Sequence, residues 1–206
     1  MSKNNEFLEN VKQRFEKAYK NMPESKRQEI KKLQEVDQQA LELNEKYNIP
    51  ERYHNATFEN FNADTTEQKE ALEIIKKQAW TKNIYLSGTV GTGKTHLAMC
   101  LKRQGAKYYH LSEIFRKVKS DFSHEQRLID DLGSVKLLIV DEVGRQRFSD
   151  FEKSLFFAII DKRWQNVKPT LIISNLSCKE FSEEYGNAVL DRLRPILLTL
   201  SGESKR

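Results

Sequence analysis

The stretch that most restricts what this chain can fold into is LSGTVGTGKT, residues 86–95. It contains three glycines, follows the apolar run NIYL, residues 83–86, and precedes the helix-forming sequence THLAMCLKR, residues 95–103. Glycine allows positive φ angles and leaves no Cβ atom to cover the backbone amides. The sequence therefore predicts a strand, a tight loop with accessible N–H groups, and a helix in succession.

The same stretch fits the pattern GxxxxGK[ST] in the strand–loop–helix context that the pattern requires. In such a loop the backbone amides and the helix N-terminus bind the phosphates, Lys94 neutralises the β- and γ-phosphates, and Thr95 offers its hydroxyl to Mg²⁺. ATP and Mg²⁺ are therefore the predicted cofactors. The predicted nucleotide-binding residues of the loop are Gly88, Thr89, Val90, Gly91, Thr92, Gly93, Lys94 and Thr95.

Polar residues follow two further apolar runs. VKLLIVDE, residues 135–142, ends in Asp141 and Glu142, and TLIISN, residues 170–175, ends in Asn175. Asp141 suits direct or indirect contact with Mg²⁺, and Glu142 suits polarisation of a water toward the γ-phosphate. Asn175 could hold the same water, although an asparagine after a strand is more often a turn residue. The acidic pair favours hydrolysis over phosphate transfer to a metabolite.

Short apolar runs alternate with helical segments after residue 63, which predicts a three-layer α/β domain with a five-stranded, mostly parallel sheet. The residues Asp64–Glu67 resemble a capping box that opens a helix running to about Trp80. The five predicted strands lie in residues 83–88, 107–111, 135–141, 169–174 and 195–200.

Residues 1–48 contain no glycine and one proline, and their apolar residues recur at steps of three and four. The pattern predicts two amphipathic helices joined near Pro23, which can open the second helix. Two interpretations stay open: the apolar stripes pack on each other or on the main domain, or they dock on a partner protein. The predicted domains are residues 1–48 and residues 49–206. The apolar positions are Leu8, Val11, Phe15, Ala18 and Met22, then Ile30, Leu33, Val36, Ala40, Leu43 and Tyr47.

The chain has 35 Lys and Arg against 30 Asp and Glu residues, and this net charge of +5 permits an anionic partner without demanding one. No apolar run approaches the roughly 18 residues of a membrane span, and the N-terminus has no apolar core for export. Cys100 and Cys178 lie outside any CxxC pattern and are expected to be reduced thiols. We expect a cytoplasmic protein with no membrane contact.

Taken together, these residues resemble the DnaC/IstB branch of the AAA+ ATPases, which comprises helicase loaders and the ATPase helpers of insertion-sequence transposition. The resemblance covers about residues 48–206 and implies a P-loop NTPase with an AAA+ core and no separate lid domain. It rests on IPERYHNATFENF, GTVGTGKTHLA, LLIVDEVG, FFAIIDKRWQNVKPTLIISNL, AVLDRLRP and GESKR.

The resemblance also implies roles that spacing does not reveal. Asn175 matches sensor 1, Arg192 matches the arginine finger that reaches the nucleotide of a neighbouring subunit, and Arg206 matches sensor 2. Arg52 and Tyr53 fall in the segment that borders the adenine. The alternative for Arg192 is an exposed helix arginine or an intramolecular salt bridge. A finger acting between subunits implies self-association into a ring or a spiral.

The implied partners are a replicative DNA helicase, bound through the N-terminal helices, and single-stranded DNA. Basic residues beside aromatic rings in residues 111–133 suit single-stranded DNA, because phosphates meet charge and bases meet ring faces. The alternative is an ordinary amphipathic helix with core phenylalanines and solvated lysines, and Arg145 with Arg147 form a second candidate patch. The candidate DNA contacts are Phe115, Arg116, Lys117, Lys119, Phe122 and Arg127.

Three functions follow from these features. The favoured one is a slow, DNA-stimulated ATPase that loads a replicative helicase. The second is a transposition helper that acts with a transposase on duplex DNA, since nothing in the ATPase core separates the two. The third is a non-catalytic helicase-binding module that uses ATP as a structural ligand. The presence of Asp141, Glu142 and Asn175 argues against this third function.

Overall fold

The computed structural model divides the chain into two compact units, residues 1–48 and residues 49–206. The roles assigned above to these two parts of the chain stay predictions. The structure describes residues 14, 18–47, 49–120, 124–144 and 148–204.

The first unit contains the helix α2 (Glu24–Lys46), with Pro23 as its N-cap residue. Proline suits this boundary because it has no N–H group and its φ of −53° is near that of a helix. Glu24 in the first turn and Lys46 in the last turn complement the helix dipole. Leu33 on this helix is 59% exposed. Most of the first predicted helix lies outside the described residues. Within its described part, residues 14 and 18–20 are helical.

The second unit is built on five parallel strands in the order β2-β3-β4-β1-β5. Each predicted run overlaps one of them, so the predicted five-stranded sheet is confirmed. Because all strands are parallel, their carboxyl ends meet at one edge, and β4 lies there between β1 and β3. The strands are β1 (Ile84–Gly88), β2 (Lys107–His110), β3 (Leu138–Val143), β4 (Thr170–Ser174) and β5 (Ile196–Leu200). β3 begins three residues later and ends two residues later than the predicted run 135–141.

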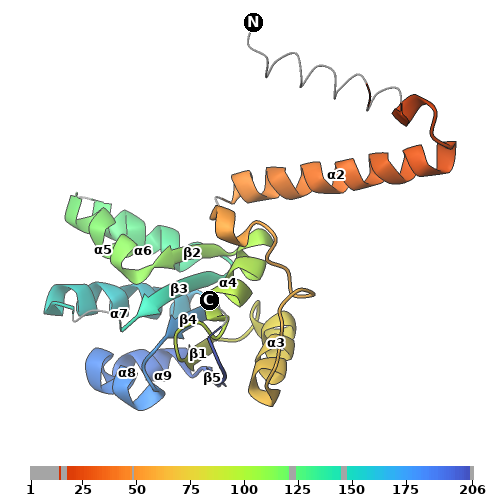
Figure 1. Cartoon of the computed structure of the whole chain (residues 1–206). Helices are drawn as coiled ribbons and strands as arrows, with labels where there is room; N and C mark the ends of the chain where they lie inside the picture. Colours follow the sequence, from red (N-terminus) through yellow and green to blue (C-terminus); the bar gives the residue numbers. More distant parts are fainter. Residues whose placement is uncertain (1–13, 15–17, 48, 121–123, 145–147, 205–206) are drawn as a thin grey trace, which may run out of the picture. The chain divides into compact units, whose positions relative to one another are not determined.

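Helices cover both faces of the sheet (Figure 1). On one face, side chains of β1, β3 and β4 join those of five helices in one buried cluster. Elsewhere α3 packs against β5, and α4 packs against β1 and β2, which completes the predicted three-layer architecture. The helices of this unit are η1 (Glu51–Tyr53), α3 (Thr66–Gln78), α4 (Lys94–Arg103), α5 (Leu111–Ser120), α6 (Glu125–Ser134), α7 (Asp150–Gln165), α8 (Cys178–Tyr185) and α9 (Asn187–Leu193).

The capping box of α3 differs by one residue from the predicted Asp64–Glu67. Thr65 is the N-cap residue, and its side chain accepts a hydrogen bond from the backbone N–H of Gln68 at 3.2 Å. Gln68 is 1% exposed and its Nε2 donates to the carbonyl oxygen of Ser201 at 2.9 Å. The tertiary bond to the segment after β5 therefore selects Gln68 as the buried member of the box.

Arg163, on α7, is 1% exposed and connects three segments of the second unit. Its Nε donates to Oγ1 of Thr170 at 2.8 Å, and its Nη1 and Nη2 donate to the carbonyl oxygens of Leu132, Val135 and Pro169. Burial lowers the pKa of Arg163 to about 10. One guanidinium therefore joins the end of α6 to the start of β4.

No helix among the described residues is long and apolar enough to cross a membrane. Cys100 and Cys178 are both free thiols in the structure. Burial raises the pKa of Cys100 to about 12, so this thiol stays protonated at neutral pH.

Candidate nucleotide-binding site

A cavity of about 440 Å³ opens at the carboxyl edge of the sheet, where the segments after β1, β3 and β4 meet. This volume lies within the range of small-molecule sites. The cavity is lined by Arg52, Tyr53, Asn60, Phe61, Asn62, Val90, Gly91, Gly93, Lys94, Thr95, His96, Asp141, Glu142, Ile173, Ser174 and Asn175. It therefore brings together residues that are more than a hundred positions apart in the sequence.

The glycines of the loop after β1 have conformations that other residues rarely adopt. The φ angle is +90° at Gly91 and +97° at Gly93. A Cβ atom at Gly93 would lie 2.6 Å from the Phe61 ring, so this position requires glycine both for its backbone and for its packing. Gly93 is also the N-cap residue of α4 and offers no capping side chain, which leaves this helix terminus to bind an anion.

The ammonium group of Lys94 is anchored at the beginning of the same loop. Its Nζ donates to the carbonyl oxygens of Gly88 at 2.6 Å and Thr89 at 2.7 Å. Lys94 is 8% exposed and lines the cavity. The Lys94 ammonium, the N-terminus of α4 and the backbone of the loop glycines thus lie at the same cavity. This combination of groups suits the binding of a polyphosphate.

Gly88, Thr89 and Thr92 belong to the loop but are not among the residues that line the cavity. The Oγ1 atom of Thr92 donates to the carbonyl oxygen of Thr89 at 2.9 Å, and Thr92 is fully buried. This bond stabilises the turn of the loop on the side away from the cavity lining. These three predicted nucleotide contacts therefore shape the loop, and their direct contact with a nucleotide stays a prediction.

The carboxylate of Asp141 is oriented by three hydrogen bonds. Its Oδ2 accepts from Oγ1 of Thr95 at 3.0 Å and from the hydroxyl of Tyr108 at 2.7 Å, and its Oδ1 accepts from the backbone N–H of Glu142 at 2.7 Å. Thr95 and Asp141, the predicted Mg²⁺ contacts, thus lie within hydrogen-bond distance of each other. Their oxygen atoms suit Mg²⁺, which also takes ligands from substrate phosphates. A bound Mg²⁺ ion would neutralise charge on the β- and γ-phosphates.

Tyr108 is a residue of the site that the sequence did not reveal. It lies on β2, which pairs with β3 so that Tyr108 is opposite Ile139 and His110 is opposite Asp141. Burial, together with the neighbouring Asp141 carboxylate, raises the pKa of Tyr108, so its hydroxyl remains a donor at working pH. Only the pairing of β2 with β3 shows that this tyrosine reaches the carboxylate.

Glu142 faces the cavity because β3 is irregular at this point. Adjacent side chains of a regular strand point to opposite faces, yet both Asp141 and Glu142 line the cavity. The pairing of β3 with β4 shifts register between Val140 and Val143, and Glu142 has a φ of +57°. Such bulges turn side chains toward functional sites, and a left-handed φ strains a residue other than glycine. The Nδ1 atom of His110 lies 3.5 Å from the Glu142 carboxylate.

Asn175 joins the acidic pair because β4 lies between β1 and β3. It follows the last residue of β4 and lines the same cavity as Lys94 and Glu142. Asn175 is far in sequence from the loop after β1, so the sequence alone does not show that the two lie close together. The strand order therefore brings the predicted sensor residue between the phosphate loop and the acidic pair.

The side of the cavity that the resemblance assigns to adenine is held against α4. Arg52 and Tyr53, on η1, both line the cavity. The guanidinium of Arg103, on α4, donates to the carbonyl oxygens of Tyr53 at 3.4 Å and of His54. The ring of Phe61 lies 5.5 Å from that of His96, also on α4. Phe61 is a second residue of the site to which the sequence assigned no role.

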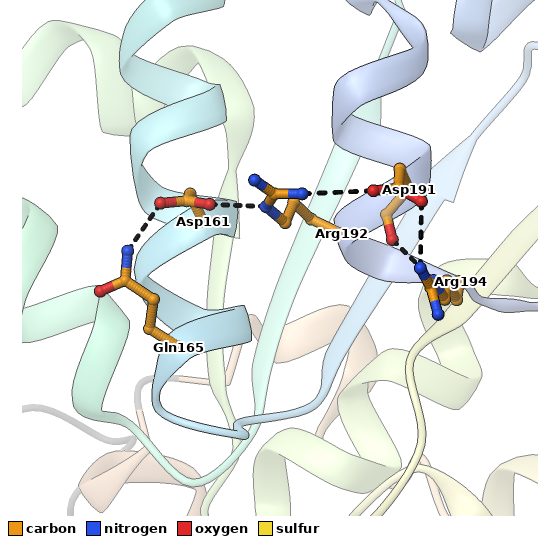
Figure 2. A network of polar contacts seen from close by, with 5 residues as sticks. All are labelled: Asp161, Gln165, Asp191, Arg192 and Arg194. Atoms are coloured by element: carbon orange, nitrogen blue, oxygen red, sulfur yellow. Dashed lines mark hydrogen bonds and ion pairs between the residues drawn. The ribbon is translucent and has the colours of Figure 1, made fainter.

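Arg192 does not line the cavity of its own chain. It lies on α9, where its Nε donates to Oδ1 of Asp161 at 2.7 Å and its Nη1 donates to Oδ2 of Asp191 at 3.2 Å (Figure 2). The intramolecular salt bridge that the sequence left open is therefore present. The role of Arg192 as a finger stays a prediction, and Arg206 lies outside the described residues.

The prediction that Phe115 stacks on DNA bases is wrong for the described conformation. Phe115 is 2% exposed, and its ring packs edge-on against Phe148 with 4.8 Å between centroids. The apolar side chains of α5 form one stripe, and burial of that stripe in the core stabilises the fold more than exposure would. The ordinary amphipathic helix, the alternative reading, describes α5.

Two of the basic candidate DNA contacts on α5 interact with other side chains of the same chain. Lys119 forms an ion pair with Glu152 at 2.9 Å, and the ammonium of Lys117 lies 4.4 Å from the centre of the Tyr109 ring. Arg116 and Arg127 are exposed, so their contact with DNA stays a prediction. Three further candidates lie outside the described residues: Phe122, Arg145 and Arg147.

Known proteins resemble this chain over most of its length. A sequence profile of the IstB-like ATP binding proteins matches residues 21–206. The replicative helicase loader DnaC of Buchnera aphidicola subsp. Acyrthosiphon pisum is 32% identical, over 77% of this chain and 72% of that protein. An ATP-binding protein of insertion sequence IS232 from Bacillus thuringiensis subsp. berliner is 30% identical, over 66% of this chain and 59% of that protein. The crystal structure of the DnaC helicase loader has the same fold, with a TM-score of 0.64 at 22% identity over 73% of this chain and 99% of that one.

Proposed function

This chain belongs to the family of IstB-like ATP-binding proteins, a branch of the AAA+ ATPases, and from that premise we propose that it is a Mg²⁺-dependent helicase-loading ATPase. It hydrolyses ATP, binds single-stranded DNA and delivers a replicative DNA helicase. The observation that carries the proposal is the convergence of Lys94, Glu142 and Asn175 on one cavity, with Asp141 bonded to Thr95 beside them.

The arrangement supports hydrolysis by a direct attack of water. Glu142 accepts a proton from a water whose oxygen forms a bond to the γ-phosphorus, and Asn175 helps to hold that water. The bond from the γ-phosphorus to the β–γ bridging oxygen breaks, and ADP leaves with the electron pair. Lys94 and the amides of the loop stabilise the negative charge of the transferred group.

Helicase delivery rests on the relatives and on the first unit of the chain. The relative from Buchnera is named a replicative helicase loader and is 32% identical to this chain over the aligned residues. In the first unit, the exposed Leu33 lies on a helix with apolar residues at helical spacing, which suits docking on a groove of another protein. We assign helicase docking to residues 1–48.

Replacement of the proposed base tests the ATPase. Glu142→Gln should retain ATP binding and lose at least about a hundredfold of the turnover measured with single-stranded DNA, since a general base contributes roughly 10²–10⁴-fold. The matched control is Glu183→Gln, because the Glu183 side chain is 66% exposed on α8 and does not line the cavity. Normal turnover in Glu142→Gln would reject the assignment of the base.

Three further outcomes, from measurements of ATP binding, helicase binding and turnover, bear on the whole proposal. Failure of the unmodified chain to bind ATP with Mg²⁺ would reject the nucleotide site. ATP binding and helicase binding without any turnover, with or without DNA, would identify a non-catalytic helicase-binding module. Stimulation by single-stranded DNA supports the loader.

Capture from a host lysate tests the partner. The immobilised full chain should retain a replicative helicase, and Leu33→Asp should retain much less of it while unfolding at the same urea concentration. The stability should hold because Leu33 is already 59% exposed. Equal helicase capture by both chains would reject this face of α2 as the docking surface.

The second candidate is a transposition helper, favoured by the 30% identity to the ATP-binding protein of insertion sequence IS232. Such a protein would contact a transposase and prefer duplex DNA. Competition between single-stranded and duplex DNA of equal length, at several salt concentrations, separates the two functions. Preference for the duplex together with capture of a transposase would replace the loader.

A further inference from the structure

We propose that Asp161 and Trp164 hold the Arg192 side chain in a parked position on its own protomer, from which a second copy of this chain draws it to a bound nucleotide. We call Asp161, Trp164 and Asp191 the arginine latch. The inference rests on the ATPase proposed above and adds to it the control of Arg192, for which Asp161 is a positioning residue.

The contacts of Arg192 define the parked position. Its Nε and Nη1 donate to two different carboxylates, and Figure 2 shows the guanidinium between Asp161 and Asp191. The central guanidinium carbon also lies 4.6 Å from the centre of the Trp164 ring. Asp161 accepts a further bond from Nε2 of Gln165 at 2.7 Å, which holds the carboxylate in place. Two helices, α7 and α9, thus fix one arginine side chain.

The topology separates Arg192 from the nucleotide site of its own chain. α9 ends at Leu193 and β5 begins at Ile196, so Arg192 lies near the edge of the sheet where the strands begin. The cavity lies at the opposite edge, and a five-residue strand is about 16 Å long. The phosphates that Arg192 can reach are therefore those of another chain.

Two exposed apolar side chains lie in or close to the latch in sequence, beside exposed charged residues such as Asp191 and Arg194. Trp164 is 52% exposed and Val167 is 87% exposed, both at the C-terminal end of α7. Val167 also has a φ of +51°, a strained conformation for a β-branched residue. Exposed tryptophan and arginine are enriched in protein interfaces. Because phosphates attract the guanidinium, the occupant that this surface fits is the nucleotide-binding face of a second copy.

The ion pairs of the latch are weak enough for Arg192 to be released from them. The Arg192 side chain is still 33% exposed and that of Asp161 is 25% exposed, and ion pairs at such positions are weak. The γ-phosphate forms the bidentate bonds that a guanidinium favours. Docking of a second copy can therefore move Arg192 from the latch to the nucleotide.

Turnover at increasing protein concentration tests the latch. In Asp161→Asn the concentration for half-maximal turnover should fall about two- to fivefold, the size of effect expected for a partly exposed ion pair. The matched control is Asp130→Asn, because Asp130 forms an ion pair with Lys162, the residue after Asp161, at 2.8 Å. The control should behave like the unmodified chain. An unchanged or increased midpoint in Asp161→Asn would overturn the latch.

A spectroscopic measurement detects the movement without reference to turnover. The chain has two tryptophans, so Trp80→Phe leaves Trp164 as the only one. In that background, a non-hydrolysable ATP analogue should change the Trp164 emission as protein concentration rises, and the change should be absent when Arg192→Ala is added. Constant emission over a concentration range in which turnover rises would overturn the proposal.

The outcomes separate this inference from the function on which it rests. Concentration-dependent turnover with no effect of Asp161→Asn rejects the latch alone. Turnover that is independent of concentration and normal in Arg192→Ala rejects both the finger and the latch and leaves the ATPase intact. Absence of turnover in the unmodified chain rejects the proposed function, and the latch with it.

Discussion

At the scale of single residues, the site depends on how a few polar groups are held. The carboxylate of Asp141 is 3% exposed, and two hydroxyl groups from separate segments donate to the same oxygen atom. Thr95 belongs to the phosphate loop, whereas Tyr108 belongs to the neighbouring strand β2. Because a carboxylate that receives fixed donors cannot rotate freely, Tyr108 would orient Asp141 toward the Mg²⁺ ion of the proposed site.

Replacement of Tyr108 tests this orientation. Tyr108→Phe keeps the ring and removes the donor, so the Mg²⁺ concentration for half-maximal turnover should rise about tenfold, since hydrogen bonds to charged groups contribute about 1.5–3 kcal/mol. ATP affinity measured without Mg²⁺ should stay the same. Tyr109→Phe, at the next residue of β2, is the control and should change neither quantity. An unaltered Mg²⁺ requirement in Tyr108→Phe would show that Asp141 needs no such donor.

At the scale of elements, an irregularity in a strand positions the residues of the candidate site. β3 ends in a bulge at Glu142, and this single irregularity directs two consecutive acids toward one cavity. At the other end of the same layer, the buried guanidinium of Arg163 joins the end of α6 to the start of β4. The segments that meet at the cavity are therefore connected through elements that are packed at the opposite edge of the sheet.

Replacement of Arg163 tests this connection. Arg163→Lys keeps the charge but has one nitrogen in place of three, so buried carbonyl groups lose their donor and the free energy of unfolding should fall by about 3 kcal/mol. Urea denaturation measures the change. The control is Arg116→Lys on the exposed face of α5, which should stay within about 0.5 kcal/mol. A comparable small change at both sites would mean that the Arg163 bonds contribute little.

At the scale of the whole molecule, the proposed assembly requires that one chain contribute to two sites. The cavity contains Lys94 and Glu142, whereas Arg192 lies near the other edge of the sheet. A head-to-tail contact that joins these two surfaces is heterologous and generates a ring or a spiral. Turnover should therefore be a property of neighbouring chains.

A mixing experiment tests this arrangement. Lys94→Ala should lose nucleotide binding and Arg192→Ala should lose turnover, so each chain alone should be inactive. In an equal mixture, about a quarter of neighbouring pairs combine an intact cavity with an intact arginine, and turnover should recover to about that fraction of the normal rate. A mixture that stays inactive, although both variants are folded and associate, would contradict a site shared between chains.

Much of the architecture and of the phosphate loop was already determined by the sequence alone. The apolar runs and the glycines act locally, because strand burial and loop geometry depend on neighbouring residues. The family resemblance rested on the same local motifs and is confirmed by the match over residues 21–206. The interior position of Phe115 and the shift of the α3 capping box to Gln68 required the tertiary structure, since packing partners far along the chain decide which face of a helix is buried.

The assembly of the site was decided by the tertiary structure. The order of the strands puts Asn175 between the loop and the acidic pair, and the pairing of β2 with β3 brings Tyr108 to Asp141. The ion pair between Arg192 and Asp161 likewise joins two residues, on different helices, that are 31 positions apart in the sequence. Local patterns specify each strand, loop and helix, but long-range pairing and packing select which side chains meet, and no periodicity in the sequence encodes those contacts.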